Sequence, residues 1–154
     1  MKLYRKVALR YIASKRNIYY WAASEAQPVN PGFKVPVWKP RHPKIEAIFE
    51  EVRLEKFPNR PSRLGAKFVC LHKKGFCQKP TGSFFHSVHE VRVKGKVFIA
   101  DMEYFTEVVM RTGGKVTEEN ERLVRSFAED YWSGNIIMSP EVIVQGDVTV
   151  LGPA

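Results

Sequence analysis

The sequence predicts an α+β fold in a single domain. Two segments, residues 43–57 and 117–134, repeat apolar residues at helical spacing. Several short runs elsewhere alternate apolar and polar residues, as half-buried strands do. Because these strands are short, we expect one mixed or antiparallel sheet with the helices packed on it. A length of 154 residues suits one domain with one hydrophobic core.

The N-terminal third predicts one strand and one long loop. A first strand is expected at about residues 2–9, although its alternation is imperfect. The aromatic triplet at 19–21 fits either a short helix or the wall of a pocket. Residues 28–43 contain half of the ten prolines, which disfavours regular structure and predicts a loop. The apolar residues in that loop should dock it onto the core.

The middle of the chain predicts a helix followed by a strand. Pro43 suits the first turn of a helix, and Pro58 ends it. The acidic residues of this helix, Glu46 among them, are expected mostly on its solvent side. After a turn that contains Pro61 and Ser62, residues 66–71 form a short apolar strand.

The second half predicts further strands and two helices. Residues 87–94 and 97–100 read as two strands joined by a tight turn at Lys94-Gly95-Lys96. A short helix is expected at 101–111. A longer helix should begin with Thr117 as its N-cap and stop at Gly134. The last strands are expected at about 141–145 and 147–151.

The charge distribution is uneven and is compatible both with an anionic partner and with plain solubility. The net charge is +9, and residues 1–45 hold ten Lys or Arg against one acid, Glu25. A basic half can bind a polyanion or an anionic cofactor, and it can equally serve solubility. The chain contains no run of 18 apolar residues, so no membrane span is predicted. Its N-terminus lacks the apolar core of a secretory signal. A cytoplasmic protein is therefore expected.

Zinc and the common hydrolase motifs receive little support. Cysteine and histidine residues cluster within twenty positions, but no tight Cys-x-x-Cys pair is present. Buried cysteines and surface histidines explain the same residues, so no metal site is expected. The cluster is Cys70, His72, Cys77, His86 and His89. The chain also lacks a nucleophile elbow and a Gly-rich phosphate loop.

One carboxylate stands out at the entrance of an apolar strand. Glu141 begins the run Glu-Val-Ile-Val-Gln-Gly, and an ionised carboxylate is costly to bury without partners. With Leu3-Tyr4-Arg5 and the segment from Arg60-Pro61-Ser62-Arg63-Leu64 to Phe68, this strand resembles the ADP-ribosyltransferase superfamily of the arginine–serine–glutamate type. The glutamate strand resembles that of the DNA-targeting ADP-ribosyltransferase toxins. The chain also resembles a family of small uncharacterised bacterial and phage proteins, in the helix from Pro43, the Arg-Pro-Ser-Arg segment, Tyr131-Trp132-Ser133-Gly134 and Glu141.

The resemblance implies a single ADP-ribosyltransferase-like domain over residues 1–154 that uses NAD as its substrate. It implies transfer of ADP-ribose to a nucleic acid or protein, with release of nicotinamide. Glu141 would stabilise the oxocarbenium-like ribose. Arg5, with Arg63 as second choice, would bind the pyrophosphate, because arginine offers a planar charged fork. Ser62 would orient the ribose or the glutamate. The candidates for stacking on nicotinamide are Phe68, Tyr19 and Tyr20.

Simpler roles stay open for each of these residues. Arg5 fits a surface base, and Ser62 fits a turn after Pro61. The family often places a second acidic or amide residue two positions before its glutamate, where this chain has Ser139. Arginine-directed modification of proteins is therefore in doubt, and a nucleic-acid acceptor would suit the basic half. The alternatives are an NAD glycohydrolase and a non-catalytic basic protein that binds nucleic acid or acts as an inhibitor.

Overall fold

A computed structural model describes residues 17–24, 29–73 and 85–154. Its strands and helices, in chain order, are β1 (Ile18–Ser24), α2 (Pro43–Lys56), β2 (Lys67–Val69), β3 (Phe85–Asp101), α3 (Met102–Thr112), α4 (Glu121–Ser133) and β4 (Pro140–Pro153). The four strands form one sheet in the order β1-β3-β4-β2, and every pairing is antiparallel. The predicted α+β class with an antiparallel sheet is confirmed. The strand predicted at 2–9 lies outside the described residues.

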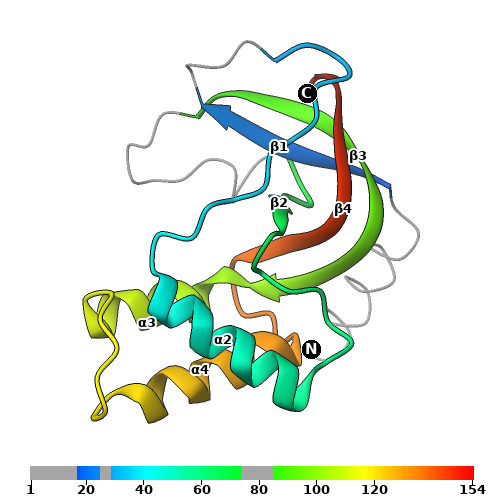
Figure 1. Ribbon diagram of the computed structural model, residues 1–154. Helices are drawn as coiled ribbons and strands as arrows, with labels where there is room; N and C mark the ends of the chain where they lie inside the picture. The colour runs from blue at the N-terminus through cyan, green and yellow to red at the C-terminus, as the bar shows by residue number, and fades with distance from the viewer. Residues whose placement is uncertain (1–16, 25–28, 74–84) are drawn as a thin grey trace.

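The two longest strands are continuous where the sequence predicted turns. β3 and β4 pair from His89 against Pro153 to Asp101 against Pro140. At mid-length Gly95 faces Gly146, with φ angles of 143° and 150°. The separate strands expected at 87–94 and 97–100, and at 141–145 and 147–151, are therefore wrong. Glycine permits this backbone, so each strand bends and continues instead of reversing (Figure 1).

The sheet curls until its two edges meet. Tyr20 of β1 donates to the Cys70 carbonyl at 3.0 Å and accepts from the Cys70 amide at 2.7 Å, just beyond β2. Because β1 and β2 stand at opposite ends of the strand order, this bridge makes the sheet an incomplete barrel. Apolar side chains fill its interior, among them Tyr19, Val91 and Val144. The aromatic triplet 19–21 thus lies on a strand and not on a helix.

The proline-rich loop packs along β4, as predicted. Val35 donates to the Val148 carbonyl at 2.9 Å, and Val150 donates to the Phe33 carbonyl at 2.8 Å. These bonds add a short extended segment beside the upper half of β4, and Val35 is buried in the interior of the curled sheet.

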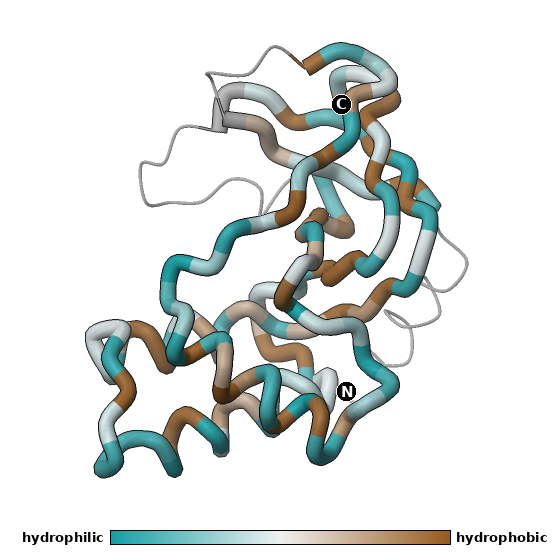
Figure 2. Tube along the Cα trace, in the orientation of Figure 1, coloured by the Kyte–Doolittle hydropathy of each residue, from teal (hydrophilic) through white to brown (hydrophobic). Residues whose placement is uncertain are grey.

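The three helices gather at one end of the molecule (Figure 1). Hydrophobic and hydrophilic positions alternate along them (Figure 2), and the hydrophobic ones bury a second core against the sheet. The predicted ends of α2 at Pro43 and before Pro58 are confirmed. Helix α4 starts later than Thr117, because Thr117 and Asn120 hydrogen-bond to each other in a preceding turn. Within the described residues no helix is long and apolar enough to cross a membrane.

Candidate functional site

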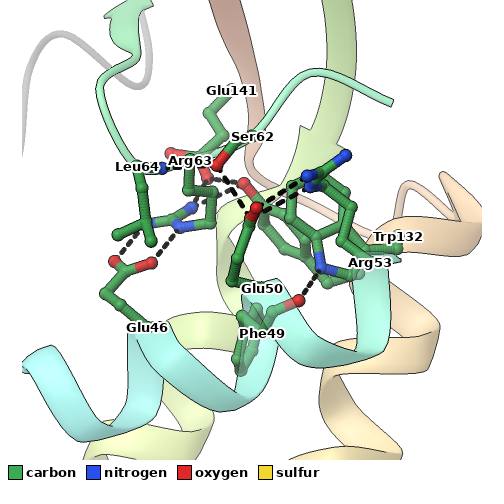
Figure 3. Close-up of polar contacts among 10 residues, drawn as sticks. Glu46, Phe49, Glu50, Arg53, Ser62, Arg63, Leu64, Trp132 and Glu141 are labelled. Carbon is green, nitrogen blue, oxygen red and sulfur yellow. Dashed lines mark hydrogen bonds and ion pairs between the residues drawn. The ribbon is translucent and has the colours of Figure 1, made fainter. Parts of the chain in front are cut away.

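Helix α2 carries a line of charged side chains on the face toward the chain that follows it. Glu46, Glu50 and Arg53 are spaced four and three residues apart, so they share one side of the helix. The segment 60–64 passes over this side and covers it (Figure 3). Glu46 is 1% exposed, and the expectation that it faces solvent is wrong. Helical spacing defines the face, but tertiary packing decides what covers it.

Arg63 lies at the centre of the covered region. Its Nε and Nη2 donate to Glu46 Oε2 and Oε1 at 2.8 and 3.0 Å, a two-point contact. Its Nη1 donates to Tyr131 OH at 2.5 Å and to Glu141 Oε1 at 2.6 Å. Arg63 is 4% exposed, and a buried guanidinium requires such partners. We call Glu46, Arg63, Tyr131 and Glu141 the Arg63 cluster; Figure 3 shows the glutamates approaching Arg63 from two sides.

Glu141 has one fixed oxygen and one open oxygen. Oε1 accepts from Arg63 and also from Tyr131 OH at 2.5 Å. Oε2 accepts no hydrogen bond from the described residues. This oxygen is also not completely buried, because the only fully buried side-chain atom without a partner among those residues is Nδ1 of His89. The residue as a whole is 3% exposed. Because β4 begins at Pro140, Glu141 does stand at the entrance of an apolar strand, as the sequence predicted.

The loop before Glu141 is anchored by the buried carboxylate of Asp101. Its Oδ1 accepts from the amides of Glu103 at 2.9 Å and Ser139 at 3.1 Å. Its Oδ2 accepts from the Met138 amide at 2.7 Å and from the Ile137 amide. Asp101 therefore caps α3 and fixes the approach to β4 at once. Asp101 was not among the residues predicted from the sequence, although an acid directly before a helix is a recognisable N-cap signal.

The electrostatics of the cluster favour a charged arginine and a neutral tyrosine. Burial lowers the pKa of Arg63, but the electrostatic interactions with Tyr131 and with the carboxylates of Glu141 and Glu46 outweigh it, so that this pKa lies well above its ordinary value. Burial is the main cause that raises the pKa of Tyr131 well above its ordinary value, and the charge of Glu141 adds to it against that of Arg63. The phenol therefore stays protonated and donates. Two carboxylates face one guanidinium, which leaves an excess of negative charge.

Aromatic rings enclose the guanidinium. The Cζ of Arg63 lies 4.3 Å from the ring centroid of Phe105 and 4.9 Å from that of Phe68. The rings of Tyr131 and Trp38 follow at 5.1 and 5.5 Å. Low-polarity walls of this kind strengthen the electrostatic interactions inside them.

Ser62 belongs to a neighbouring network around Glu50. Arg53 donates to both oxygens of Glu50, at 3.0 and 2.6 Å. Ser62 Oγ donates to Glu50 Oε2 at 2.8 Å and accepts from the Leu64 amide at 3.0 Å. Burial raises the pKa of Glu50, but the hydrogen bonds from Arg53 and Ser62 outweigh it, so that this pKa is lowered. Ser62 thus secures the turn that carries Arg63.

Comparison with protein families gives one match. The model of a family described as "Protein of unknown function (DUF2441)" matches residues 39–153. The chain belongs to the DUF2441 family. The matched region runs from before α2 through β4 and includes every member of the Arg63 cluster. Strand β1 precedes it. A search of curated proteins found no match.

Within the DUF2441 region, the structure brings together some of the predicted site residues. Arg63 and Glu141 touch, and Ser62 lies next to Arg63 but bonds Glu50 in place of Glu141. The expectation that Arg63 offers its fork to a pyrophosphate disagrees with the geometry, because four of its N–H donors already serve Glu46, Tyr131 and Glu141. Arg5 lies outside the described residues.

The predicted stacking residues separate into two regions. Phe68 stands beside Arg63, with its ring 5.3 Å from that of Trp38. Tyr19 is fully buried inside the curled sheet and has no face for a ligand. Tyr20 is half-buried on β1, where its backbone bridges to Cys70.

No metal site emerges from the described residues. They contain no group of three or more His, Cys, Asp or Glu side chains placed to hold an ion. Of the cluster considered in the sequence, Cys70 and His89 are buried and His72 is exposed. Cys77 and the side chain of His86 lie outside the described residues.

Proposed function

We propose that the chain binds NAD and transfers its ADP-ribose part to a macromolecular acceptor, with release of nicotinamide. The observation that carries the proposal is Glu141, whose Oε1 is fixed by Arg63 and Tyr131 while Oε2 has no partner in the described residues. The resemblance of the arginine, serine and glutamate segments to ADP-ribosyltransferases supplies the substrate.

The proposed chemistry needs a carboxylate more than any other group. The bond between C1′ of the ribose and the nicotinamide nitrogen breaks, and nicotinamide leaves with the bonding electrons. Positive charge then develops on the ribose, as in glycoside cleavage. The carboxylate of Glu141 would stabilise that charge, and its Oε2 would accept a hydrogen bond from a ribose hydroxyl. A nucleophile of the acceptor forms the new bond to C1′ and loses its proton.

Arg63 and Tyr131 act as positioning residues in this proposal. Both donate to Glu141 Oε1, which leaves the other oxygen directed to the substrate. In this proposal Arg5 binds the pyrophosphate of NAD. Phe68, beside Arg63, is supported as the nicotinamide partner over Tyr19, which is fully buried.

Nicotinamide release from NAD tests the proposal, with nucleic acid and cell lysate offered separately as acceptors. Glu141→Gln keeps the shape of the side chain and is expected to lower the release at least about 100-fold, the loss typical of a group that stabilises transition-state charge. Mass spectrometry of the products separates transfer from hydrolysis: free ADP-ribose alone identifies an NAD glycohydrolase.

Glu46→Gln is the matched control, because it removes a carboxylate from the same cluster on the other side of Arg63. It should lower thermal stability as Glu141→Gln does, yet keep most of the activity. Equal loss of activity in both variants would reduce Glu141 to a structural role. Absence of NAD binding and turnover in the wild type would overturn the proposal.

A further inference from the structure

One face of the sheet changes character along β3. Alternate residues of a strand share a face. On one side of β3, Phe98 and Ala100 pack into the core beneath the helices. The preceding positions on the same side, Arg92, Lys94 and Lys96, are exposed. Since the helices cover one end of the molecule (Figure 1), the face that is apolar beneath them becomes basic beyond them.

A fourth cation joins this face from the proline-rich loop. Lys34 bridges to Thr149 of β4, and its Nζ donates to Thr149 Oγ1 at 2.7 Å. Thr149 pairs in turn with Arg92 of β3. Paired residues of adjacent antiparallel strands point to the same side. One surface across β3, β4 and the extended segment beside β4 therefore carries four cations, and we call it the basic face. The four are Lys34, Arg92, Lys94 and Lys96.

The cations of the basic face are not neutralised within the described residues. Asp147 lies opposite Lys94, and Glu90 lies two residues before Arg92 on the same side. Within the described part of the chain, neither of these two carboxylates forms an ion pair with any of the four cations. By contrast, Lys56 and Arg125 on the helices pair with Glu129, Glu51 and Glu55. Four cations against two carboxylates leave a surplus of positive charge.

We propose that the basic face binds the phosphodiester backbone of a nucleic acid. Such binding rests on unpaired Lys and Arg side chains, with neutral donors between them. Thr149 and Gln145 supply those donors, since they pair with Arg92 and Lys96 on the same face. An anionic membrane fits less well, because such surfaces usually add large apolar side chains. Among the residues whose exposure the structure describes, no exposed large apolar side chain lies on β3 or β4.

The inference goes beyond the proposed NAD chemistry and names a partner without depending on it. The test is fluorescence anisotropy of labelled RNA, single-stranded DNA and duplex DNA, each of about 20 nucleotides or base pairs. The binding mixtures contain no NAD. Titrations at about 50 and 200 mM salt give the salt dependence. The three nucleic acids separate a single-strand from a duplex preference.

The triple variant Arg92→Gln, Lys94→Gln, Lys96→Gln should weaken binding by about tenfold or more. The slope of log affinity against log salt should become shallower by about 2, because each phosphate contact contributes about 0.7 with a single strand. The control variant Lys44→Gln, Lys115→Gln, Arg122→Gln removes the same charge from exposed positions on or beside the helices. It should keep the wild-type affinity.

Three outcomes would overturn the inference. The first is no binding of any of these nucleic acids at the lower salt concentration. The second is an equal loss in the control variant, which would make the effect one of net charge alone. The third is binding to vesicles with about a fifth phosphatidylserine that depends on the basic face when nucleic-acid binding does not. Because the binding is measured without NAD, its outcome is distinguishable from the outcome of the NAD assay.

Discussion

At the scale of single residues, the charge of Arg63 survives burial because oxygen atoms from three other residues meet it. Such an ion pair adds little net stability compared with apolar residues of the same volume, but removal of one partner costs about 3–5 kcal/mol. A loss of activity in a Glu141 variant alone therefore does not separate a loss of chemistry from a loss of stability. This is why a variant of Glu141 needs Glu46→Gln beside it.

Tyr131 makes the cluster sensitive to alkaline pH. Its pKa is raised in the folded state by burial, whereas in the unfolded chain a tyrosine titrates near pH 10. Below about pH 10 both states hold the proton and the full stabilisation is present. Above it the unfolded state loses the proton first, so the stabilisation falls as the pH rises.

We expect Tyr131→Phe to cost about 1.5–3 kcal/mol near neutral pH, the usual worth of a hydrogen bond to a charged group. The difference from the wild type should narrow above about pH 10, since phenylalanine has no proton to release. Urea unfolding of both proteins across this range measures it. A difference that stays constant or widens would contradict the role given to the phenol.

At the scale of elements, the close approach of the two backbones at Gly95 on β3 and Gly146 on β4 decides the shape of the sheet. A Cβ added to Gly95 would lie 2.3 Å from the Gln145 carbonyl oxygen, and one added to Gly146 would lie 2.2 Å from the Lys94 carbonyl oxygen. Both positive φ angles also disfavour any other residue. The bend thus depends on two glycines that the sequence presents as ordinary turn residues.

Gly95→Ala is expected to destabilise the fold by about 3 kcal/mol or more, from backbone strain together with overpacking. Gly152→Ala is the matched control on β4, because a Cβ there meets no atom within 4 Å. Its effect should stay within about 0.5 kcal/mol. Chemical denaturation measures the free energy of unfolding of both variants. Similar losses of stability would mean that the two backbones do not approach closely at Gly95.

At the scale of the whole molecule, two cores share the same two strands. Phe98 faces the helices, whereas its neighbour Ile99 faces the interior of the curled sheet. Loss of either core therefore exposes apolar side chains of both β3 and β4. The matched family region, residues 39–153, contains the helical core but lacks β1 and the segment around Val35.

A fragment of residues 39–154 is accordingly expected not to unfold in one cooperative transition. It lacks Tyr19 and Val35, so the interior of the curled sheet opens to water, and β3 loses its pairing with β1. Circular dichroism during urea titration, compared with the full chain, measures this. A single transition at the full-chain midpoint would show that the family region folds by itself.

The sequence predicted what depends on local pattern and missed what depends on tertiary packing. The start of α2, the stop at Gly134 and the docked proline loop follow from residue chemistry, and all three are observed. The burial of Glu46 could not be predicted, because it requires Arg63 to arrive from another segment. The turn predicted at Lys94-Gly95-Lys96 is wrong, because glycine permits a close approach of two backbones as well as a chain reversal. Glu141 could be predicted from its placement at the entrance of an apolar strand. Its hydrogen bond from Tyr131 could not, because helix α4 has to bring the phenol to it.

The close approach of the backbones at Gly95 and Gly146 also limits how DUF2441 sequences can diverge. An added side chain at either position would collide with backbone atoms of the opposite strand. A change of residue type at the partner position cannot remove a backbone atom, so no second mutation there restores the first. Among relatives that keep this bend, both glycines should therefore persist independently, without the compensating exchanges that link two side chains in contact.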